Sequence, residues 1–332
     1  MKCITLTPNE KNLGTCVRQL SEGNIIGVPT ETVYGLAGNA LQYESVRKIF
    51  SIKGRPLIDP LIVHFSSSEE ARKYIYAPVE FDQLSTAFWP GPLTLVLKKR
   101  SNIPDIVTAG LDSVAIRIPS NSIFKSLLKQ LDFPLAAPSA NPFGYVSPTC
   151  AQHVKHTLGD KLGFILDDGP CHHGLESTIL DMRNPANPTI LRHGPVEVSA
   201  IESALGVKVT VRSDRTNKNQ AQDSPGLLSK HYSPNTCVKL FEPRSNPRIK
   251  VTEKCAIIYQ SKRKEMQTKL GPAVNVYWLS DDGNPEVCAK QLYSLLQKVD
   301  TYGFNQLWVE KSSDSKLGIA INDRLMRAAS DI

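Results

Sequence analysis

The sequence has 332 residues, of which 41% are hydrophobic and 21% charged, and its formal net charge is +7. This composition excludes a largely disordered chain, and the length suffices for two domains. No run approaches 18 apolar residues, and the seven cysteines contain no C-x-x-C pair, so we expect a soluble cytoplasmic protein without a membrane segment or a disulfide framework.

The first two hundred residues alternate irregularly between helical and strand-like patterns. Apolar spacing predicts helices over 9–22, 45–52, 68–76, 81–88, 123–130 and 148–158. Short apolar or β-rich runs predict strands over 25–28, 61–65, 93–97, 114–118, 135–137, 163–166, 178–181 and 189–192. Because the alternation is irregular and some strands are hairpin-like, we predict an α/β fold with a mixed sheet.

The composition changes near residue 211. Residues 211–226 contain almost no apolar side chains, which predicts a linker. Strands are then predicted over 237–241, 255–259, 274–278 and 307–310, with helices over 286–299 and 320–329. This alternation predicts a second, smaller Rossmann-like α/β domain, although no G-x-G-x-x-G supports dinucleotide binding there. We therefore expect domains at 1–210 and 236–332, joined by a linker or lid at 211–235.

Polar side chains gather at the ends of two predicted strands between residues 29 and 65. Thr32 lies in a turn after the first strand, Lys53 and Arg55 follow a helix, and His64 ends an apolar run. In open α/β sheets ligands bind at such strand ends, and a lysine and an arginine placed together can bind a phosphate group. The alternatives are a solvated K-x-R pair, a threonine that only satisfies its turn and a core histidine. We expect Lys53 and Arg55 to be exposed, so that replacing either leaves the thermal melt nearly unchanged.

Further candidates come from buried-looking polar residues downstream. Arg117 lies in the strand-like run VAIRIP and needs an anion, either a substrate carboxylate or a protein carboxylate such as Asp112. Ser139 and Asn141 follow an apolar strand and could line a phosphate or adenine cradle. Arg192 ends a predicted strand, where the alternative is a surface residue.

Two polar stretches invite a metal interpretation. The adjacent residues Cys171, His172 and His173 cannot easily converge on one tetrahedral zinc ion. Asp167 and Asp168 could bind magnesium, but a polar loop explains them equally well. We therefore assign no protein metal ligand.

Eight stretches, found in one order over the first two hundred residues, resemble the YrdC-type family of L-threonylcarbamoyladenylate synthases. They are PTETVYGL, KGRP, PLIVH, WPGPLTLVL, TAGLDSVAIRIP, APSAN, ESTI and LRHGP. The C-terminal part resembles the long form of the family, which adds a second domain. The resemblance implies a twisted, mixed (YrdC-like) sheet around a concave pocket.

The resemblance also implies a reaction and its reactants. L-threonine, bicarbonate and ATP would give L-threonylcarbamoyladenylate and diphosphate, with Mg²⁺ carried by ATP. The product would pass to a separate tRNA threonylcarbamoyl transferase that modifies the adenosine next to the anticodon. The modest positive charge is also compatible with weak RNA binding.

The family's motifs assign site residues to matching positions of this chain. The catalytic residues implied are Lys53 and Arg55. The threonine-binding residues implied are Thr32, His64, Arg117, Ala137 and Ser177. The nucleotide-binding residues implied are Lys53, Arg55, Ser113, Ser139, Asn141, Ser147, Arg192 and Tyr232. Members of the family often have asparagine where this chain has Asp59, whose carboxylate would repel phosphate unless it faces Arg55 or magnesium.

Two other function classes and one structural question remain open. An RNA-binding module is one alternative, although no dense Lys/Arg tract with interleaved aromatics occurs. A carbamoyl transferase of metallocentre assembly is the other, but the cysteine clusters of those proteins are absent here. The segment 224–234 contains two leucines, Lys230, His231 and Tyr232, which favours a lid over the nucleotide rather than a passive tether.

Overall fold

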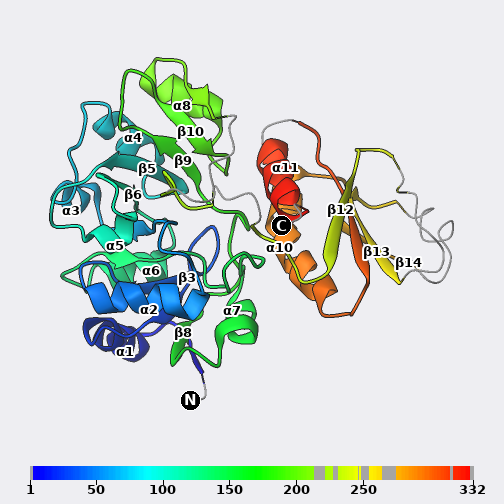
Figure 1. Ribbon diagram of the computed structural model, residues 1–332, viewed down its shortest axis with the longest axis horizontal. Helices are drawn as coiled ribbons and strands as arrows, with labels where there is room; N and C mark the ends of the chain where they lie inside the picture. Colours follow the sequence, from blue (N-terminus) through cyan, green and yellow to red (C-terminus); the bar gives the residue numbers. More distant parts are fainter. Residues whose placement is uncertain are drawn as a thin grey trace. The chain divides into compact units, whose positions relative to one another are not determined.

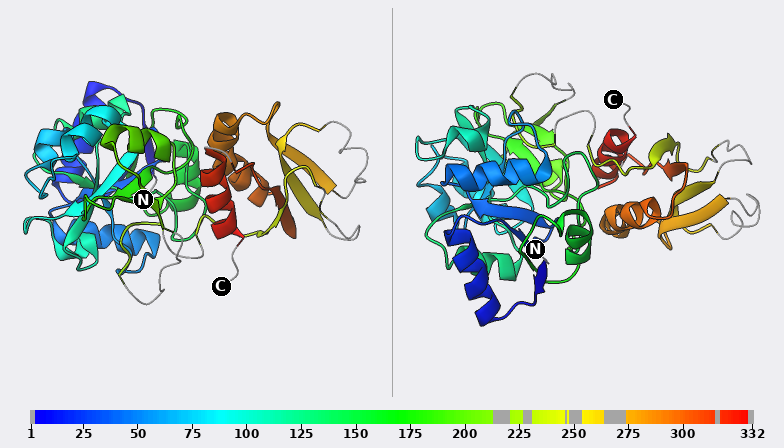
Figure 2. Two further views of the ribbon diagram at one scale, coloured as in Figure 1. Left: turned by 90° about the horizontal axis from the view of Figure 1, so that it is seen from above. Right: turned by 60° about the horizontal axis from the view of Figure 1, so that its bottom comes forward.

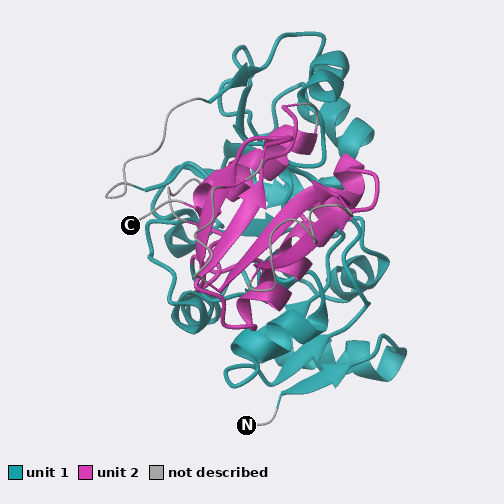
Figure 3. Ribbon diagram, turned by 90° about the vertical axis from the view of Figure 1, so that its right-hand side faces the viewer, with its two compact units in different colours: residues 1–143, 148–172, 176–228 teal, residues 144–147, 173–175, 229–332 magenta. Residues whose placement is uncertain are grey.

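The structure is a computed structural model that describes residues 3–212, 221–226, 231–245, 247, 254–263, 274–314 and 317–329 (Figure 1). The chain forms two compact units (Figure 3). Unit 1 comprises residues 1–143, 148–172 and 176–228, and unit 2 comprises residues 144–147, 173–175 and 229–332. Two short pieces from the middle of the sequence therefore group with the C-terminal part.

Unit 1 contains the first eleven strands and first eight helices. The strands are β1 (Ile4–Leu6), β2 (Ile26–Val28), β3 (Gly35–Asn39), β4 (Ile62–His64), β5 (Leu93–Lys98), β6 (Ser113–Arg117), β7 (Leu135–Ala136), β8 (Phe164–Leu166), β9 (Thr178–Asp181), β10 (Thr189–Arg192) and β11 (Thr210–Val211). The helices are α1 (Glu10–Ser21), α2 (Tyr43–Lys53), α3 (Ser68–Ala71), α4 (Phe81–Phe88), α5 (Asp105–Thr108), α6 (Ser122–Leu128), α7 (Ala151–Leu158) and α8 (Val198–Leu205).

The strands of unit 1 form one mixed sheet, which confirms the predicted fold class. Their order is β1-β8-β2-β3-β7-β4-β6-β5-β9-β10-β11. Strand β4 runs parallel to β6 and antiparallel to β7, and β5 runs antiparallel to β6. In the β4–β6 pair His64 is opposite Arg117. Two predicted site residues, distant in sequence, therefore lie side by side at the carboxyl ends of neighbouring strands.

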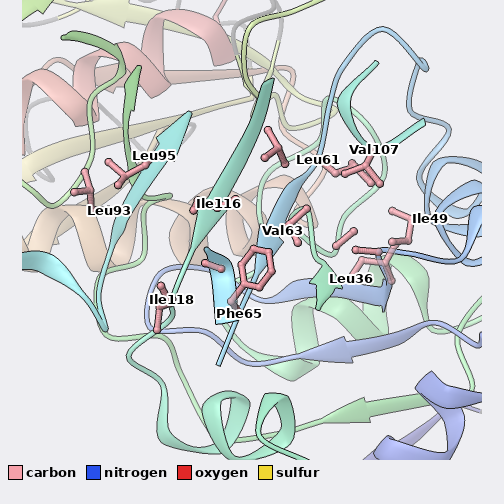
Figure 4. Close-up of a cluster of buried hydrophobic side chains, with 14 of the residues drawn as sticks. Leu36, Ile49, Leu61, Val63, Phe65, Leu93, Leu95, Val107, Ile116 and Ile118 are labelled. Carbon is pink, nitrogen blue, oxygen red and sulfur yellow. The ribbon is translucent and has the colours of Figure 1, made fainter. Parts of the chain in front are cut away.

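The two faces of this sheet bury different hydrophobic clusters. Successive strand side chains point to opposite faces, so Ile25 and Leu36 join one cluster whereas Ile26 and Ala37 join the other. The larger cluster includes Ile49 of α2 and is drawn in Figure 4. Helices α1 and α6 contribute to the smaller cluster. The sheet is thus covered on both faces, and its strand ends remain for a site.

Unit 2 is built on a four-stranded parallel sheet in the order β12-β15-β13-β14. Its elements are β12 (Cys237–Phe241), β13 (Cys255–Ser261), β14 (Val274–Ser280), α10 (Pro285–Asp300), β15 (Gln306–Glu310) and α11 (Leu317–Ala328). Helices α10 and α11 pack together on one face of this sheet (Figure 2). The prediction of a smaller Rossmann-like α/β domain is confirmed.

Some predicted elements differ from the structure. Strand β3 has the sequence GLAGN, whose glycines are typical of a turn, and it pairs with β2 and β7. Helix α7 begins at Ala151 with Cys150 as its N-cap, three residues after the predicted start. The predicted helix over 68–76 ends at Ala71. Among the described helices, none is both long and apolar enough to span a membrane.

Candidate active site

In the turn between β2 and β3, two threonines make different hydrogen bonds. The Thr30 hydroxyl accepts hydrogen bonds from the N–H groups of Thr32 and Val33 at 3.1 and 3.2 Å, and it donates one to the Val33 carbonyl at 2.6 Å. Thr30 therefore satisfies the turn backbone. The Thr32 hydroxyl instead accepts a hydrogen bond from Nη1 of Arg117 at 3.0 Å. Thr32 is thus oriented toward the strand that carries the predicted substrate-binding arginine.

Arg117 is buried and binds three protein oxygens. Besides Thr32, its Nε donates to the Gly91 carbonyl at 3.2 Å and its Nη2 to the Glu31 carboxylate at 2.6 Å. The protein carboxylate beside Arg117 is therefore Glu31 and not Asp112, the partner considered from the sequence. A guanidinium has more N–H donors than these three contacts use, so Arg117 can still bind a substrate carboxylate.

His64 lies beside Arg117 in a buried position. Its ring is 5.5 Å from that of Phe124, and its Nδ1 has no hydrogen-bond partner among the described residues. Burial, together with the nearby charge of Arg117, lowers the pKa of His64 to about 3. The ring is therefore neutral at physiological pH and can exchange a hydrogen bond with a substrate hydroxyl.

This depressed pKa predicts a specific acid sensitivity. The unfolded chain binds a proton on His64 near pH 6.5 but the folded chain does not, so stability present above about pH 6.5 is lost as the pH falls toward 3. Relative to a His64→Gln variant, the wild type should lose about 1.4 kcal/mol of unfolding free energy per pH unit in this window. Urea unfolding of both proteins between pH 7 and pH 4 measures the difference. If the unfolding free energies of the two proteins change in parallel with pH, His64 is not a buried neutral ring.

Ser177 and Arg192 form a second buried cluster. The Ser177 hydroxyl lies 2.7 Å from that of Thr94, and Arg192 donates to the Ser177 hydroxyl at 3.2 Å and to its carbonyl at 3.1 Å. The chain after Arg192 passes very close, since a Cβ on Gly194 would lie 2.4 Å from the Thr178 nitrogen. Glycine is therefore required at this turn. Arg192 is buried at this strand end and is not the surface residue considered from the sequence.

The described start of the predicted lid packs within unit 1. Nη1 of Arg192 donates to the Pro225 carbonyl at 3.4 Å, and the Gln222 nitrogen donates to the Ile58 carbonyl at 2.9 Å. The Asp223 carboxylate pairs with two arginines at 2.8 and 2.6 Å. Residues 221–226 are therefore held to unit 1 by contacts with Ile58, Arg192 and two further arginines, Arg183 and Arg212. Residues 213–220 and 227–230 lie outside the described residues.

Lys53 ends α2 beneath the predicted nucleotide loop. Gly54, in the left-handed region at φ 64°, terminates the helix. The Lys53 ammonium donates to the carbonyls of Ser139 and Asn141 at 2.5 and 2.7 Å. Burial, with the nearby charge of Arg55, holds the pKa of Lys53 well below its usual range. Lys53 thus supports the loop that carries two predicted nucleotide-binding residues.

Arg55 is held in place by Asp59. The two side chains form a buried ion pair of 2.9 Å, and Arg55 also donates to the carbonyls of Asp59 and Pro60 at 2.9 and 2.7 Å. Burial raises the pKa of Asp59, although Arg55, Lys53 and Arg192 oppose the rise. Asp59 therefore faces Arg55. The prediction that the two cations are exposed is wrong, because Lys53 and Arg55 are only 4% and 7% exposed.

The cations form a cluster with excess positive charge. Lys53, Arg55 and Arg192 all act electrostatically on one carboxylate, Asp59, so they gather around it. Such a cluster attracts an anion with several charges, as a nucleotide phosphate chain is. Within the described part of the chain, no group of three or more His, Cys, Asp or Glu side chains is placed to hold a metal ion.

The remaining predicted residues lie in different surroundings. Ala137 and Ser113 are buried in unit 1, where the Ser113 hydroxyl has no partner among the described residues. Ser147 belongs to unit 2, where its carbonyl accepts a hydrogen bond from Gln297 at 2.9 Å. Tyr232 also belongs to unit 2, and its backbone is left-handed at φ 63°. Its ring stacks on Tyr293 with centroids 5.8 Å apart.

Sequence reasoning missed Glu31 and Thr94. Glu31 is the acidic residue inside PTETVYGL, and its position directly before Thr32 was the available signal. Thr94 sits in an apolar strand and gave no signal of its own, because its partner Ser177 is distant in sequence.

Comparisons with known proteins agree over the whole chain. A Sua5/YciO/YrdC family model described as "Telomere recombination" matches residues 18–194, and a model described as "Threonylcarbamoyl-AMP synthase, C-terminal domain" matches residues 196–330. Threonylcarbamoyl-AMP synthase from Pyrococcus abyssi is 37% identical, covering 93% of this chain and 92% of that protein. The Bacillus subtilis protein of the same name is 34% identical, with 98% and 94% covered.

Solved structures give the same result. The crystal structure of P. abyssi Sua5 complexed with L-threonine is 31% identical and covers 99% of this chain and 98% of that one, with a TM-score of 0.84. Escherichia coli YciO, at 20% identity and a TM-score of 0.53, shares the fold over 60% of this chain. The chain therefore belongs to the Sua5/YciO/YrdC family, in the long form that carries the threonylcarbamoyl-AMP synthase C-terminal domain.

Proposed function

We propose that this protein synthesises L-threonylcarbamoyladenylate from L-threonine, bicarbonate and ATP, with release of diphosphate. One contact supports this proposal best. Arg192 of the cation cluster donates to both the hydroxyl and the carbonyl of Ser177, which the resemblance assigns to threonine. The residue assigned to threonine and a residue assigned to phosphate are therefore in direct contact. A reaction between the two substrates requires that their binding sites adjoin in this way.

The proposed chemistry needs no protein nucleophile. The threonine ammonium loses a proton, and its nitrogen then gains a carboxylate from bicarbonate, with loss of water, to form a carbamate. An oxygen of this carbamate attacks the α-phosphorus of ATP, and the bond to the diphosphate breaks. Lys53, Arg55 and Arg192 would bind the phosphates and offset the developing negative charge. Since Asp59 is engaged by Arg55, we expect Mg²⁺ to arrive with ATP and to be held by phosphate oxygens and water.

The fate of the product follows from its chemistry. A mixed anhydride of a carbamate and AMP hydrolyses in water, so an enclosed site is required. We propose that it passes to a separate transferase that modifies the tRNA adenosine next to the anticodon.

Diphosphate release from ATP tests the proposed function. Release should require both L-threonine and bicarbonate. Salt-sensitive RNA binding without such turnover would favour an RNA-binding module instead.

We expect the site to select its amino acid by the hydroxyl group. His64 Nδ1 and the hydroxyl pair of Ser177 and Thr94 are polar groups that a substrate hydroxyl can satisfy. A site built to bond a hydroxyl rejects an analogue without it more strongly than one that lacks a methyl group. L-Serine should therefore support diphosphate release at least about tenfold better than L-2-aminobutyrate. Equal use of the two amino acids would contradict this assignment.

We further propose that residues 224–234 close over the nucleotide. Gly226 is left-handed at φ 80°, and Pro225 is already bonded to Arg192, so phosphate binding at Arg192 would act directly on this segment. Cleavage by a protease near residue 226 should slow when ATP and L-threonine are both present. Cleavage in the presence of either ligand alone is the control. If the two ligands together do not slow cleavage, the segment is a passive tether.

Tyr232 offers a second measure of the lid. Replacing it by alanine should release more free threonine and AMP per ATP consumed, since water then reaches the adenylate. The Tyr232→Phe variant keeps the ring that stacks on Tyr293 and is the matched control. If the adenylate survives equally long in both variants, the ring of Tyr232 does not shield it from water.

A further inference from the structure

Glu31 carries a buried carboxylate oxygen that no described residue satisfies. The residue is 6% exposed, and its Oε1 accepts the hydrogen bond from Arg117 at 2.6 Å. Its Oε2 is fully buried and has no hydrogen-bond partner among the described residues. An unpaired buried carboxylate oxygen is costly, and such atoms are rare in native proteins. A donor from a ligand would remove this cost.

The charge of Glu31 defines the donor it can take. Burial raises the pKa of this carboxyl group, but the charge and hydrogen bond of Arg117 and the backbone N–H groups of Glu31 and Ser120 outweigh burial and lower it overall. Glu31 is therefore ionised at neutral pH and can only accept hydrogen bonds. The strongest partner for an anionic acceptor is a cationic N–H donor.

The neighbours of Glu31 are the residues of the proposed amino-acid site. Arg117 and Thr32 bond to each other, and Arg117 is opposite His64 in the β4–β6 pair. The Arg117–Glu31 pair presents one positive and one negative group side by side. A free α-amino acid is a zwitterion that presents an ammonium and a carboxylate on one carbon, so the pair matches it in charge.

We infer that Glu31 binds the ammonium group of the amino-acid substrate through Oε2, while the remaining N–H donors of Arg117 bind its carboxylate. This assignment rests on the proposed function, which makes this site the threonine site. After carboxylation the nitrogen keeps one N–H, which still donates to Oε2. Glu31 is thereby a specificity-determining residue that selects α-amino acids against carboxylic acids without the amino group.

Direct binding tests this role without any catalytic readout. Calorimetric titration of the full chain with L-threonine is compared with (R)-3-hydroxybutanoate, which keeps the carboxylate and the hydroxyl but lacks the amino group. The wild type should prefer L-threonine by at least about 100-fold, because the analogue leaves Oε2 unpaired. In the Glu31→Gln variant this preference should fall to about tenfold or less, mainly through weaker threonine binding.

A matched control separates this role from the general loss of a buried carboxylate. Glu310 at the end of β15 is 2% exposed and pairs with Arg263, far in sequence from the site. The Glu310→Gln variant should keep the wild-type preference. Circular dichroism establishes that each variant is folded, and the wild-type comparison of the two ligands stands even if Glu31→Gln does not fold.

The outcomes distinguish this inference from the function on which it rests. A wild type that binds L-threonine but binds 3-hydroxybutanoate as tightly, or a folded Glu31→Gln variant with an unchanged preference, would overturn the assignment of Glu31 alone. A wild type that binds no L-threonine would overturn the proposed function and this assignment together.

Discussion

Replacing Arg55 by alanine is expected to abolish threonine-dependent diphosphate release and to lower the unfolding free energy by about 3–5 kcal/mol. The change removes the partner of Asp59, whose side chain is fully buried and lies 2.9 Å from the guanidinium. Breaking a buried ion pair on one side leaves an uncompensated charge, which is the source of the large cost. Turnover is lost because a phosphate-binding cation is gone.

A double variant separates the two effects. Arg55→Ala combined with Asp59→Ala removes both charges, so it should regain much of the lost stability but no activity. Lys53→Ala should also abolish turnover, since it releases the carbonyls of Ser139 and Asn141. Chemical unfolding and the diphosphate assay are the measurements. Near-normal turnover in Arg55→Ala and in Lys53→Ala would show that the KGRP stretch does not bind the nucleotide.

The second large effect is expected at Arg117. Its replacement by alanine leaves Glu31 without the guanidinium to which it is paired and removes the proposed contact with the substrate carboxylate. We expect a loss of about 3–5 kcal/mol in unfolding free energy, and threonine binding too weak for calorimetry. Both consequences arise from one guanidinium that bonds three protein oxygens.

Arg183 provides the matched control for Arg117. Like Arg117 it is an ion-paired arginine, with Asp181 and Asp223 as its partners, but its side chain is 29% exposed. Arg183→Ala should cost only about 1 kcal/mol, because partly solvated ion pairs contribute little. It should leave threonine affinity unchanged. Equal losses in the two variants would contradict the distinction between a site arginine and a surface arginine.

The sequence predicted the elements whose patterns are strong. Helices with a clear apolar face, such as α1 and α10, begin and end within one residue or so of their predicted bounds. Strand β3 was missed because GLAGN carries little β propensity, and its pairing with β2 and β7 stabilises it instead. Tertiary pairing is not visible in a local pattern.

The candidate site was predicted as a set of residue types, and the structure supplies their partners. His64 and Arg117 lie side by side through the β4–β6 register, which spacing in sequence cannot reveal. Lys53 was expected to be an exposed cation of the site, but it is buried and donates to the carbonyls of a distant loop. The partner of Arg117 is Glu31, 86 residues away in the chain, rather than nearby Asp112.

We propose that the threonine nitrogen is carboxylated before it is joined to AMP. Mass spectrometry of a reaction with ATP, L-threonine and ¹³C-bicarbonate tests this order of steps. We expect one product that contains AMP, threonine and a single ¹³C carbon, and no such product when bicarbonate is omitted. An adenylate of threonine that contains no ¹³C, formed equally well without bicarbonate, would contradict it.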